Sequence, residues 1–276
     1  MSYQLDKLEE EILKQFSKNN NLKPIVKRLD KLLDKNNPKS YIDAFNKIHD
    51  VIQNSNKDVQ KNLDAEEQKR KQEGKTYDKK QASKSVVGNL FPSCIIYLFI
   101  QNKLIGNIKP NIFIVSRKKV QIIDNFQEMS TIKIGAEDTQ KPDFDLVIFR
   151  RANQKEEDKK DKIKAEKMII ISVKTSLRER AGQTYKWKLL LEIATEPNSK
   201  IKEKYEISYE PKQPPLICFA TVNFYNELNN PQQRGMLKFF DKAFLAKEVP
   251  KMPSAFIDPL SSLVEFVNKE MNNAET

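Results

Sequence analysis

The chain of 276 residues is long enough for one large domain, or for a main domain with a smaller one. It carries 49 lysines and arginines against 38 aspartates and glutamates, and this formal net charge of +11 favours a polyanionic partner, with nucleic acid as the first candidate. Its two cysteines, Cys94 and Cys218, lie in apolar runs, which predicts buried, reduced thiols and argues against a disulfide framework or a cysteine-based metal site.

Several other classes are disfavoured by what the sequence lacks. His49 is the only histidine and lies on a predicted helix, so neither a zinc cage nor a cysteine or serine hydrolase is expected. The six glycines form no phosphate-binding loop. The first residues lack the pattern of a signal peptide, and the longest apolar run, Cys94 to Ile100, is short for a bilayer. We therefore expect a soluble, cytoplasmic protein without membrane contact.

The N-terminal third is predicted to be helical. Apolar residues recur at helical spacing over three segments, residues 5–16, 24–33 and 42–52. These stripes are expected to belong to a core. The strongly polar segment 57–84 continues the helical pattern, with a break at Gly74.

The middle of the chain predicts a buried helix and then strands. The run from Val86 to Ile100 predicts a buried helix, or a helix followed by a strand, around Pro92. Strands are predicted at four places, residues 112–115, 120–123, 146–149 and 168–174. The last two are the central strands, and the charged connector 151–167 between them is predicted to be an exposed hairpin loop.

The C-terminal part predicts helices around one more central strand. A helix is expected after Arg180 as far as Ala194, and a second, amphipathic helix over residues 234–249. The continuous apolar run 216–222 predicts a strand that is covered on both faces. A last helix is expected over residues 260–271, and its apolar stripe packs either on its own core or on another subunit.

The two central strands carry acids at the entrance of one and a lysine at the exit of the other. Side chains alternate along a strand, so Asp143 and Asp145 share a face, as do Ser172 and Lys174. Pairing the strands as a hairpin brings Asp143 close to Lys174. A carboxylate there suits Mg²⁺, and a lysine can orient water and offset charge on a phosphate. Each residue alone is common at strand ends, but the ordered pair predicts a metal-dependent phosphodiesterase site.

Arg178-Glu179-Arg180 follows Lys174 closely, at the start of the next predicted helix, where the backbone also favours phosphate. Arginine bonds guanine O6 and N7 in the major groove, and glutamate accepts from cytosine N4. The triplet predicts contacts with G·C pairs, against the plainer interpretation of a solvated helical turn. Three residues that follow are candidates for contacts with flanking bases or phosphates, or for ordinary helix packing: Gln183, Tyr185 and Lys186.

The array Pro142-Asp143, Ser172-Val173-Lys174 and Arg178-Glu179-Arg180 resembles the PD-(D/E)XK type II restriction endonucleases. It is most similar to the branch that recognises CCGG or related CCNGG cores. The resemblance implies an α/β fold, with a mixed central sheet flanked by helices and preceded by a helical N-terminal region. It also implies that Arg178 and Arg180 contact guanines and that Glu179 contacts cytosines.

The same resemblance implies Mg²⁺-dependent cleavage of double-stranded DNA at a short palindrome. The implied partners are a second copy in a homodimer, or further copies in a tetramer or higher assembly, and a cognate methyltransferase in the host. It divides the chain into three parts: a helical region (1–73), a catalytic and DNA-recognition domain (74–249) and a C-terminal helical extension (250–276) that lies between subunits in one of the two alternatives.

One position departs from the family pattern. The usual second acid stands two residues before the lysine, where this chain has Ser172. In this branch the acid is often moved to the following helix, but the corresponding positions are Trp187 and Lys188. Three replacements stay open: Glu192, one helical turn beyond Lys188; Asp78, in the stretch Gly74 to Asp78; and Asp145, on the face of Asp143. We therefore predict Asp143, Lys174, Glu192 and Asp78 as catalytic residues, and Asp143, Asp145 and Glu192 as metal ligands.

Two other functions stay open beside the nuclease. The chain could be a non-catalytic, sequence-specific DNA-binding protein that keeps the nuclease fold, or a structural protein whose charge reflects genome composition. Retained DNA binding without cleavage in Mg²⁺ distinguishes the first, and failure to bind any DNA distinguishes the second.

Overall fold

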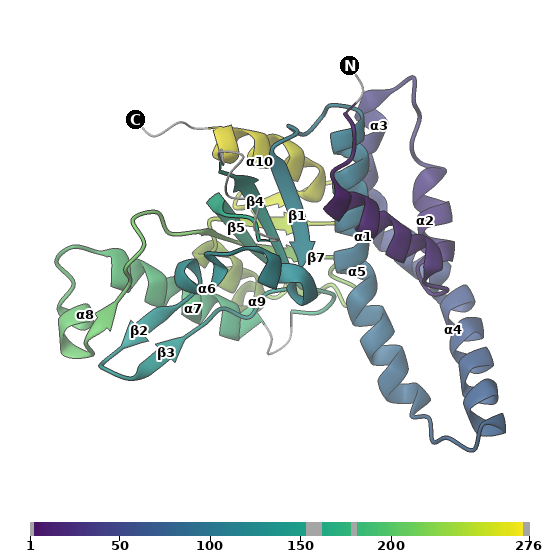
Figure 1. The fold of residues 1–276 in the computed structure, drawn as a ribbon, viewed down its shortest axis with the longest axis horizontal. Helices are drawn as coiled ribbons and strands as arrows, with labels where there is room; N and C mark the ends of the chain where they lie inside the picture. The colour runs from purple at the N-terminus through teal and green to yellow at the C-terminus, as the bar shows by residue number, and fades with distance from the viewer. Residues whose placement is uncertain (1–2, 153–161, 178–180, 273–276) are drawn as a thin grey trace.

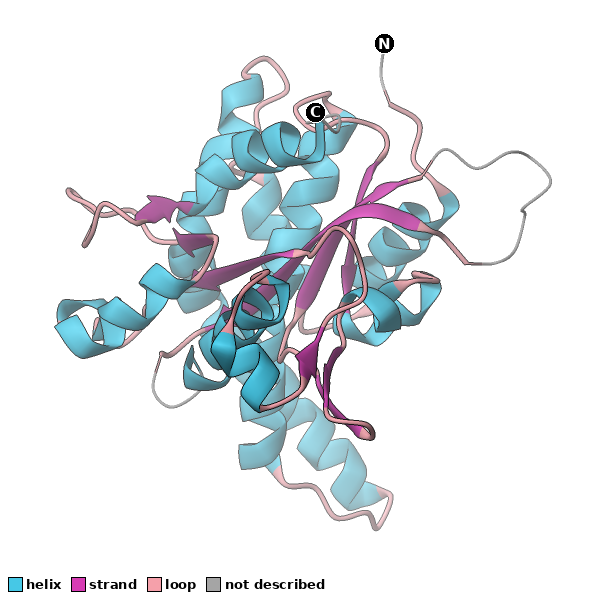
Figure 2. Cartoon of the chain, turned by 90° about the vertical axis from the view of Figure 1, so that its left-hand side faces the viewer, coloured by secondary structure: helices cyan, strands magenta, loops and turns pink. Residues whose placement is uncertain are grey.

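The structure is a computed structural model that describes residues 3–152, 162–177 and 181–272. Its centre is a six-stranded mixed sheet in the order β1-β4-β5-β7-β8-β9. The strands are β1 (Ile112–Ser116), β4 (Leu146–Arg151), β5 (Ala165–Lys174), β7 (Leu216–Thr221), β8 (Lys242–Leu245) and β9 (Ile257–Pro259). Helices lie on both sides of the sheet (Figure 2). The predicted fold class, a mixed sheet flanked by helices behind a helical N-terminal region, is confirmed.

The sheet changes direction at β5. Strands β1, β4 and β5 pair antiparallel, whereas β5, β7, β8 and β9 pair parallel. The two central strands are therefore the predicted hairpin, with Leu146 opposite Ile171. Residues 153–161 of the charged connector lie outside the described residues.

The alternation of side chains explains why these strands are apolar throughout. On β4, Leu146 and Ile148 point into one core together with the long helix α5 (Lys79–Leu104) and the last helix α10 (Leu263–Asn272). Val147 and Phe149 point into a second core on the other face, with α7 (Ala181–Thr195). A strand buried on both faces needs apolar side chains at every position.

The N-terminal helices pack around α5 (Figure 1). They are α1 (Lys7–Lys18), α2 (Lys23–Asp30), α3 (Pro38–Asp43) and α4 (Ile48–Gln72). The predicted third helix is interrupted by a 3₁₀ turn, Ala44–Lys47, after which α4 runs through the polar segment as predicted. The predicted break is also confirmed, because Gly74 has a left-handed backbone (φ +69°) between α4 and α5.

The run from Val86 to Ile100 is a helix throughout, not a helix followed by a strand, because Pro92 lies inside the continuous helix α5. By length and composition alone α5 meets the criteria for a membrane span, although the run Cys94 to Ile100 is short. Its second half, from Leu90 onward, is the centre of the first core, as expected for the core helix of a globular domain. The Cys94 thiol is buried there, and the Cys218 thiol is buried in β7; both are free, as predicted.

Two predicted elements are wrong. The expected strand 120–123 is largely a 3₁₀ helix, Arg117–Ile122, because the backbone turns off the sheet after β1 where the Arg117 N–H donates to the Asp145 carbonyl. The expected helix 234–249 is instead α9 (Pro231–Gly235), a 3₁₀ turn (Met236–Phe239) and strand β8. There, pairing with β7 and burial of Ala243, Phe244 and Leu245 override the local helical pattern.

The sequence also missed the shortest elements. A three-stranded sheet, in the order β3-β2-β6, lies beside α7. The missed elements are β2 (Ile132–Ile134), β3 (Asp138–Gln140), β6 (Ile207–Ser208), β9 and the helices α6 (Phe126–Met129) and α8 (Lys200–Lys204). Strands of two or three residues are too short for a periodic signal. The predicted last helix is confirmed as α10, after a 3₁₀ turn (Leu260–Ser262), and its apolar residues lie in the chain's own core.

Candidate active site

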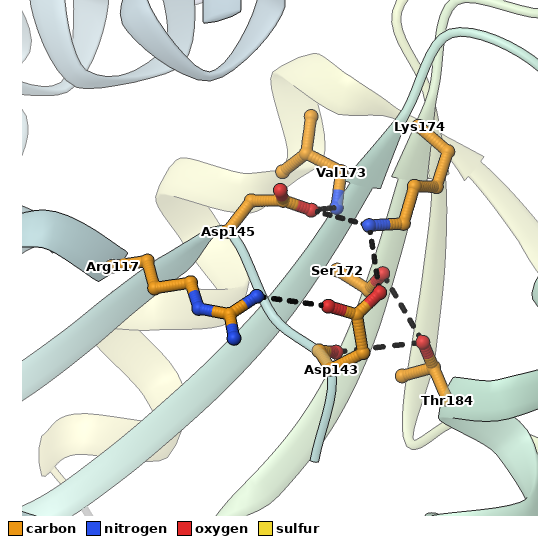
Figure 3. Close-up of polar contacts among 7 residues, drawn as sticks. All are labelled: Arg117, Asp143, Asp145, Ser172, Val173, Lys174 and Thr184. Atoms are coloured by element: carbon orange, nitrogen blue, oxygen red, sulfur yellow. Dashed lines mark hydrogen bonds and ion pairs between the residues drawn. The ribbon is translucent and has the colours of Figure 1, made fainter. Parts of the chain in front are cut away.

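The β4–β5 hairpin brings two carboxylates to one lysine (Figure 3). The Lys174 ammonium at the end of β5 lies 3.0 Å from Asp143 Oδ2 and 2.9 Å from Asp145 Oδ2. The register explains this, because residues 143 and 145 precede β4 directly and so lie across from the end of β5. The Lys174 side chain is only 9% exposed, so its charge is compensated mainly by these two acids.

Asp145 is held by the backbone as well as by the lysine. Its Oδ2 accepts a 2.7 Å hydrogen bond from the Val173 N–H, one residue before Lys174. Its own N–H donates to the Ile171 carbonyl, which continues the ladder of the hairpin. Both carboxylates are about 30% exposed, so one side of each faces solvent.

Arg117 is a member of this cluster that the sequence interpretation missed. Its Nη1 donates to Asp143 Oδ1 at 3.2 Å, and the guanidinium lies over the Phe144 ring. The side chain is 63% exposed. The only sequence signal was a basic turn after β1, and nothing local relates that turn to Asp143, 26 residues later.

The position of the usual second acid is filled by a hydroxyl network. Ser172 is fully buried, and its Oγ accepts from Thr184 Oγ1 at 3.2 Å. Thr184, on α7, also lies 3.4 Å from the Asp143 carbonyl. On the side of α7, the group next to the Asp143 backbone is therefore a neutral hydroxyl, that of Thr184.

Glu192 and Asp78 are not brought to this cluster. Glu192 lies two helical turns beyond Thr184, about 12 Å along the axis of α7, where it is 56% exposed and pairs with Lys188. Lys188 in turn binds Asp241, near the opposite end of β7. Asp78 is the N-cap of α5, and its side chain accepts from the Gln81 N–H. Of the three proposed second acids, only Asp145 contacts Lys174.

The predicted base-reading residues are only partly described. Arg178, Glu179 and Arg180 lie outside the described residues, as does the side chain of Gln183. Lys186 is exposed on α7. Tyr185 packs instead of projecting, because its ring stacks on Phe239 at 5.3 Å between centroids.

The loop that leads to this triplet is held by an acid the sequence did not suggest. Glu227 accepts from Ser176 Oγ at 2.7 Å and from the Leu177 N–H at 2.6 Å. A carboxylate that accepts two hydrogen bonds holds a loop firmly. It comes from the 3₁₀ turn Glu227–Asn229 after β7, fifty residues away, so no local pattern reveals it.

The cluster fits a small, hard cation. Within residues 3–152, 162–177 and 181–272 no group of three or more acidic, histidine or cysteine side chains gathers as a metal cage. Mg²⁺ needs no such cage, since it is commonly bound by one or two carboxylates with waters and substrate phosphates. Asp143 and Asp145 form such a pair, since both are partly exposed and both contact the Lys174 ammonium.

Comparison with known proteins agrees with this architecture. The family described as BsaWI restriction endonuclease type 2 matches residues 119–266, a range that contains Asp143, Asp145 and Lys174. No curated protein matches the chain. Because the family match spans more than half of the sequence and includes Asp143, Asp145, Lys174 and every strand of the central sheet except β1, this chain belongs to the BsaWI-type family of type II restriction endonucleases, nucleases that bind and hydrolyse DNA.

Proposed function

We propose that the protein makes Mg²⁺-dependent double-strand breaks at a short palindrome with a CCGG-like core. The observation that carries this proposal is the Lys174 ammonium held between Asp143 and Asp145 at the open end of the hairpin. A nuclease of this family needs a place where a phosphate, a water and a cation meet, and the Lys174 cluster supports such a place because it joins two partly exposed carboxylates to one ammonium.

Each side chain has a role that its contacts suit. Asp143 and Asp145 would hold Mg²⁺, which when bound neutralises charge on the phosphate and favours ionisation of the attacking water. With a cation held by the carboxylates, Lys174 would direct its ammonium at the phosphate and the water. Arg117 holds the outer oxygen of Asp143 and supplies a second positive charge at the solvent side.

We assign recognition of the DNA bases to residues 178–180, the segment that follows Lys174 after three residues. Arg178, Glu179 and Arg180 come directly after Leu177, whose N–H is bound by Glu227. With the loop held there, we assign the two arginines to guanines and the glutamate to cytosines in the major groove. A palindrome is read most simply by two copies, so we propose a homodimer, or an assembly of such dimers, in the cytoplasm beside a cognate methyltransferase.

Digestion of a sequenced plasmid in Mg²⁺ tests the proposal, with Lys174→Ala as the paired variant. We expect discrete fragments whose ends share a CCGG-like core, and loss of these fragments in the variant. Sequencing the ends also reports the flanking bases and the cut position.

One observation favours a second candidate, a non-catalytic DNA-binding protein with this fold. Ser172 stands where the family usually has an acid, and it is closed off by Thr184. Specific binding to a CCGG duplex by a wild-type protein that cuts no DNA in Mg²⁺ or Mn²⁺ would establish that candidate instead.

A further inference from the structure

The N-terminal half of α5 is a basic wall beside the candidate site. The last buried residue of α4 is Leu63, and burial on α5 begins at Leu90. The hairpin between them, residues 64–89, is here called the arm, and it extends beyond the sheet (Figure 1). The arm lies outside the range 119–266 that matches the family.

An open hollow of about 650 Å³ separates the arm from the end of β5. Its lining includes Ser83, Lys84 and Gly88 of α5 on one side, and Asp145, Lys174 and Tyr225 on the other. A second hollow of about 370 Å³ shares Asp145 and continues along α5, past Arg117, Lys118 and Lys119. The two hollows meet at Asp145 and together form a groove along α5, whose second part is also bounded by α1.

The charges on the arm are not equally compensated. Four of its basic residues form ion pairs within the arm: Arg70, Lys71, Lys75 and Lys79. Within the part of the chain that the structure describes, Lys80 and Lys84 have no acidic partner, and both are exposed. They lie one turn apart on the same side of α5, the side of Ser83 and Gly88. Lys84 lines the first hollow and Lys80 lies one turn beyond it, whereas Lys69, likewise exposed and without an acidic partner among the described residues, is on α4 and lines neither hollow.

The opposite wall ends in an exposed aromatic ring. Tyr225 is 65% exposed and sits between Asn223 (φ 51°) and Asn226 (φ 54°), both in the left-handed region that non-glycine residues rarely adopt. The loop is held to the site, because the Phe224 N–H donates to the carbonyl of Thr175, the residue after Lys174. The loop therefore presents the Tyr225 ring at the edge of the hollow that Lys174 also lines.

We propose that this groove is the track of the DNA strand that is cut, and that Lys84 and Lys80 bind the phosphates next to the scissile one. Tyr225 packs on a nucleotide from the other wall. The inference rests on the proposed function for its substrate and adds a phosphate-binding site on the arm. A groove lined by the exposed cations Lys84, Arg117 and Lys118, with Lys80 one turn beyond Lys84 and with only partly exposed acids, fits a polyanion in extended form.

The test measures how DNA affinity depends on salt. The full-length protein binds a labelled duplex with a CCGG core, without divalent metal, over about 50 to 200 mM KCl. Each phosphate contact contributes about 0.9 to the slope of log K against log salt. We expect Lys84→Ala and Lys80→Ala each to lower the slope by about that amount, and the double variant by about twice as much. Tyr225→Ala should weaken binding several-fold with the slope unchanged.

Lys57→Ala is the matched control, because Lys57 is an exposed lysine on α4, outside the arm, whereas Lys80 is one turn from the groove-lining Lys84. Its slope should equal that of the wild type. If the double variant Lys80→Ala/Lys84→Ala has the salt slope of the wild type, and the wild type cleaves DNA, this inference is wrong and the proposed function stands. If that variant instead sediments as a smaller species, the arm joins two copies of the chain and the inference is also wrong. A wild-type protein that binds no DNA overturns both.

Discussion

Asp145 is the better-held of the two acids that contact Lys174. It accepts from the Val173 N–H and from the Lys174 ammonium, so its orientation is set by the hairpin itself. Asp143 is shared between Lys174 and the exposed Arg117. A cation that displaces the ammonium therefore meets one rigid ligand and one adjustable ligand.

Asp145→Asn should lower Mg²⁺-dependent cleavage by about 100-fold or more, since it removes the charge that binds the cation. Asparagine still accepts from the Val173 N–H, so the hairpin should keep its stability. Plasmid cleavage and the Mg²⁺-induced shift in thermal unfolding are the measurements. Glu192→Gln serves as the control, and cleavage lost equally in that variant would return Glu192 to the site.

The loop between β5 and α7 connects the candidate catalytic residues to the proposed recognition segment. It follows Lys174 directly, and its anchor, Glu227, comes from the chain beyond β7. The catalytic and base-reading residues are thus connected through three residues of backbone. A change at Glu227 is expected to affect which DNA is bound more than whether DNA is bound.

Glu227→Ala should lower the ratio of specific to non-specific affinity by about tenfold or more, because the Ser176 hydroxyl and the Leu177 N–H lose their common acceptor. Binding to a CCGG duplex and to a scrambled duplex gives that ratio. Glu227→Gln keeps one acceptor oxygen, so its ratio of specific to non-specific affinity should lie between those of the wild type and Glu227→Ala. If both duplexes lose affinity equally, Glu227 supports only the fold.

At the scale of the whole molecule, a buried ion pair fastens the N-terminal helix to the core. Lys103 of α5 and Glu9 of α1 are 2.6 Å apart, and both are essentially inaccessible to solvent. The ammonium also lies over the Phe113 ring of β1, and Tyr3 donates to the second oxygen of Glu9. Removing one partner of such a pair leaves an isolated buried charge.

Burial lowers the pKa of Lys103 to about 8, and the Glu9 carboxylate offsets part of that effect. Between this value and the ordinary lysine pKa near 10.4, the unfolded chain binds more protons than the folded chain. The contribution of Lys103 to the free energy of unfolding therefore rises with pH in this window, by at most about 1.4 kcal/mol per pH unit.

Denaturant unfolding at pH 8 and 9.5 measures this contribution, with Glu9→Gln/Lys103→Met as the neutral reference. The stability of the wild type relative to that variant should increase by about 1 kcal/mol across the interval, since titrations common to both cancel. A constant difference would mean that Glu9 compensates the lysine fully and that its pKa stays near the ordinary value.

The sequence by itself determined the elements whose side chains repeat with a clear period. The apolar runs of β4, β5 and β7 and the stripes of the N-terminal helices were all predicted, because burial on one or two faces imposes a pattern on the chain. Strand alternation also placed Asp143 near Lys174 before any coordinates. Both facts follow from local geometry, as adjacent strands of one hairpin leave little freedom of pairing.

Only the tertiary structure decided which acid completes the cluster and what surrounds it. Glu192 comes first among the three acids that the sequence leaves open, but the hairpin register brings Asp145 to Lys174, whereas the rise of α7 carries Glu192 away. Arg117 and Glu227 reach the site from elements far along the chain, and Thr184 reaches it from the next helix. Strand β8 likewise exists because β7 offers an edge to pair with. Contacts of this kind depend on where distant elements pack, and no periodicity within a segment records them.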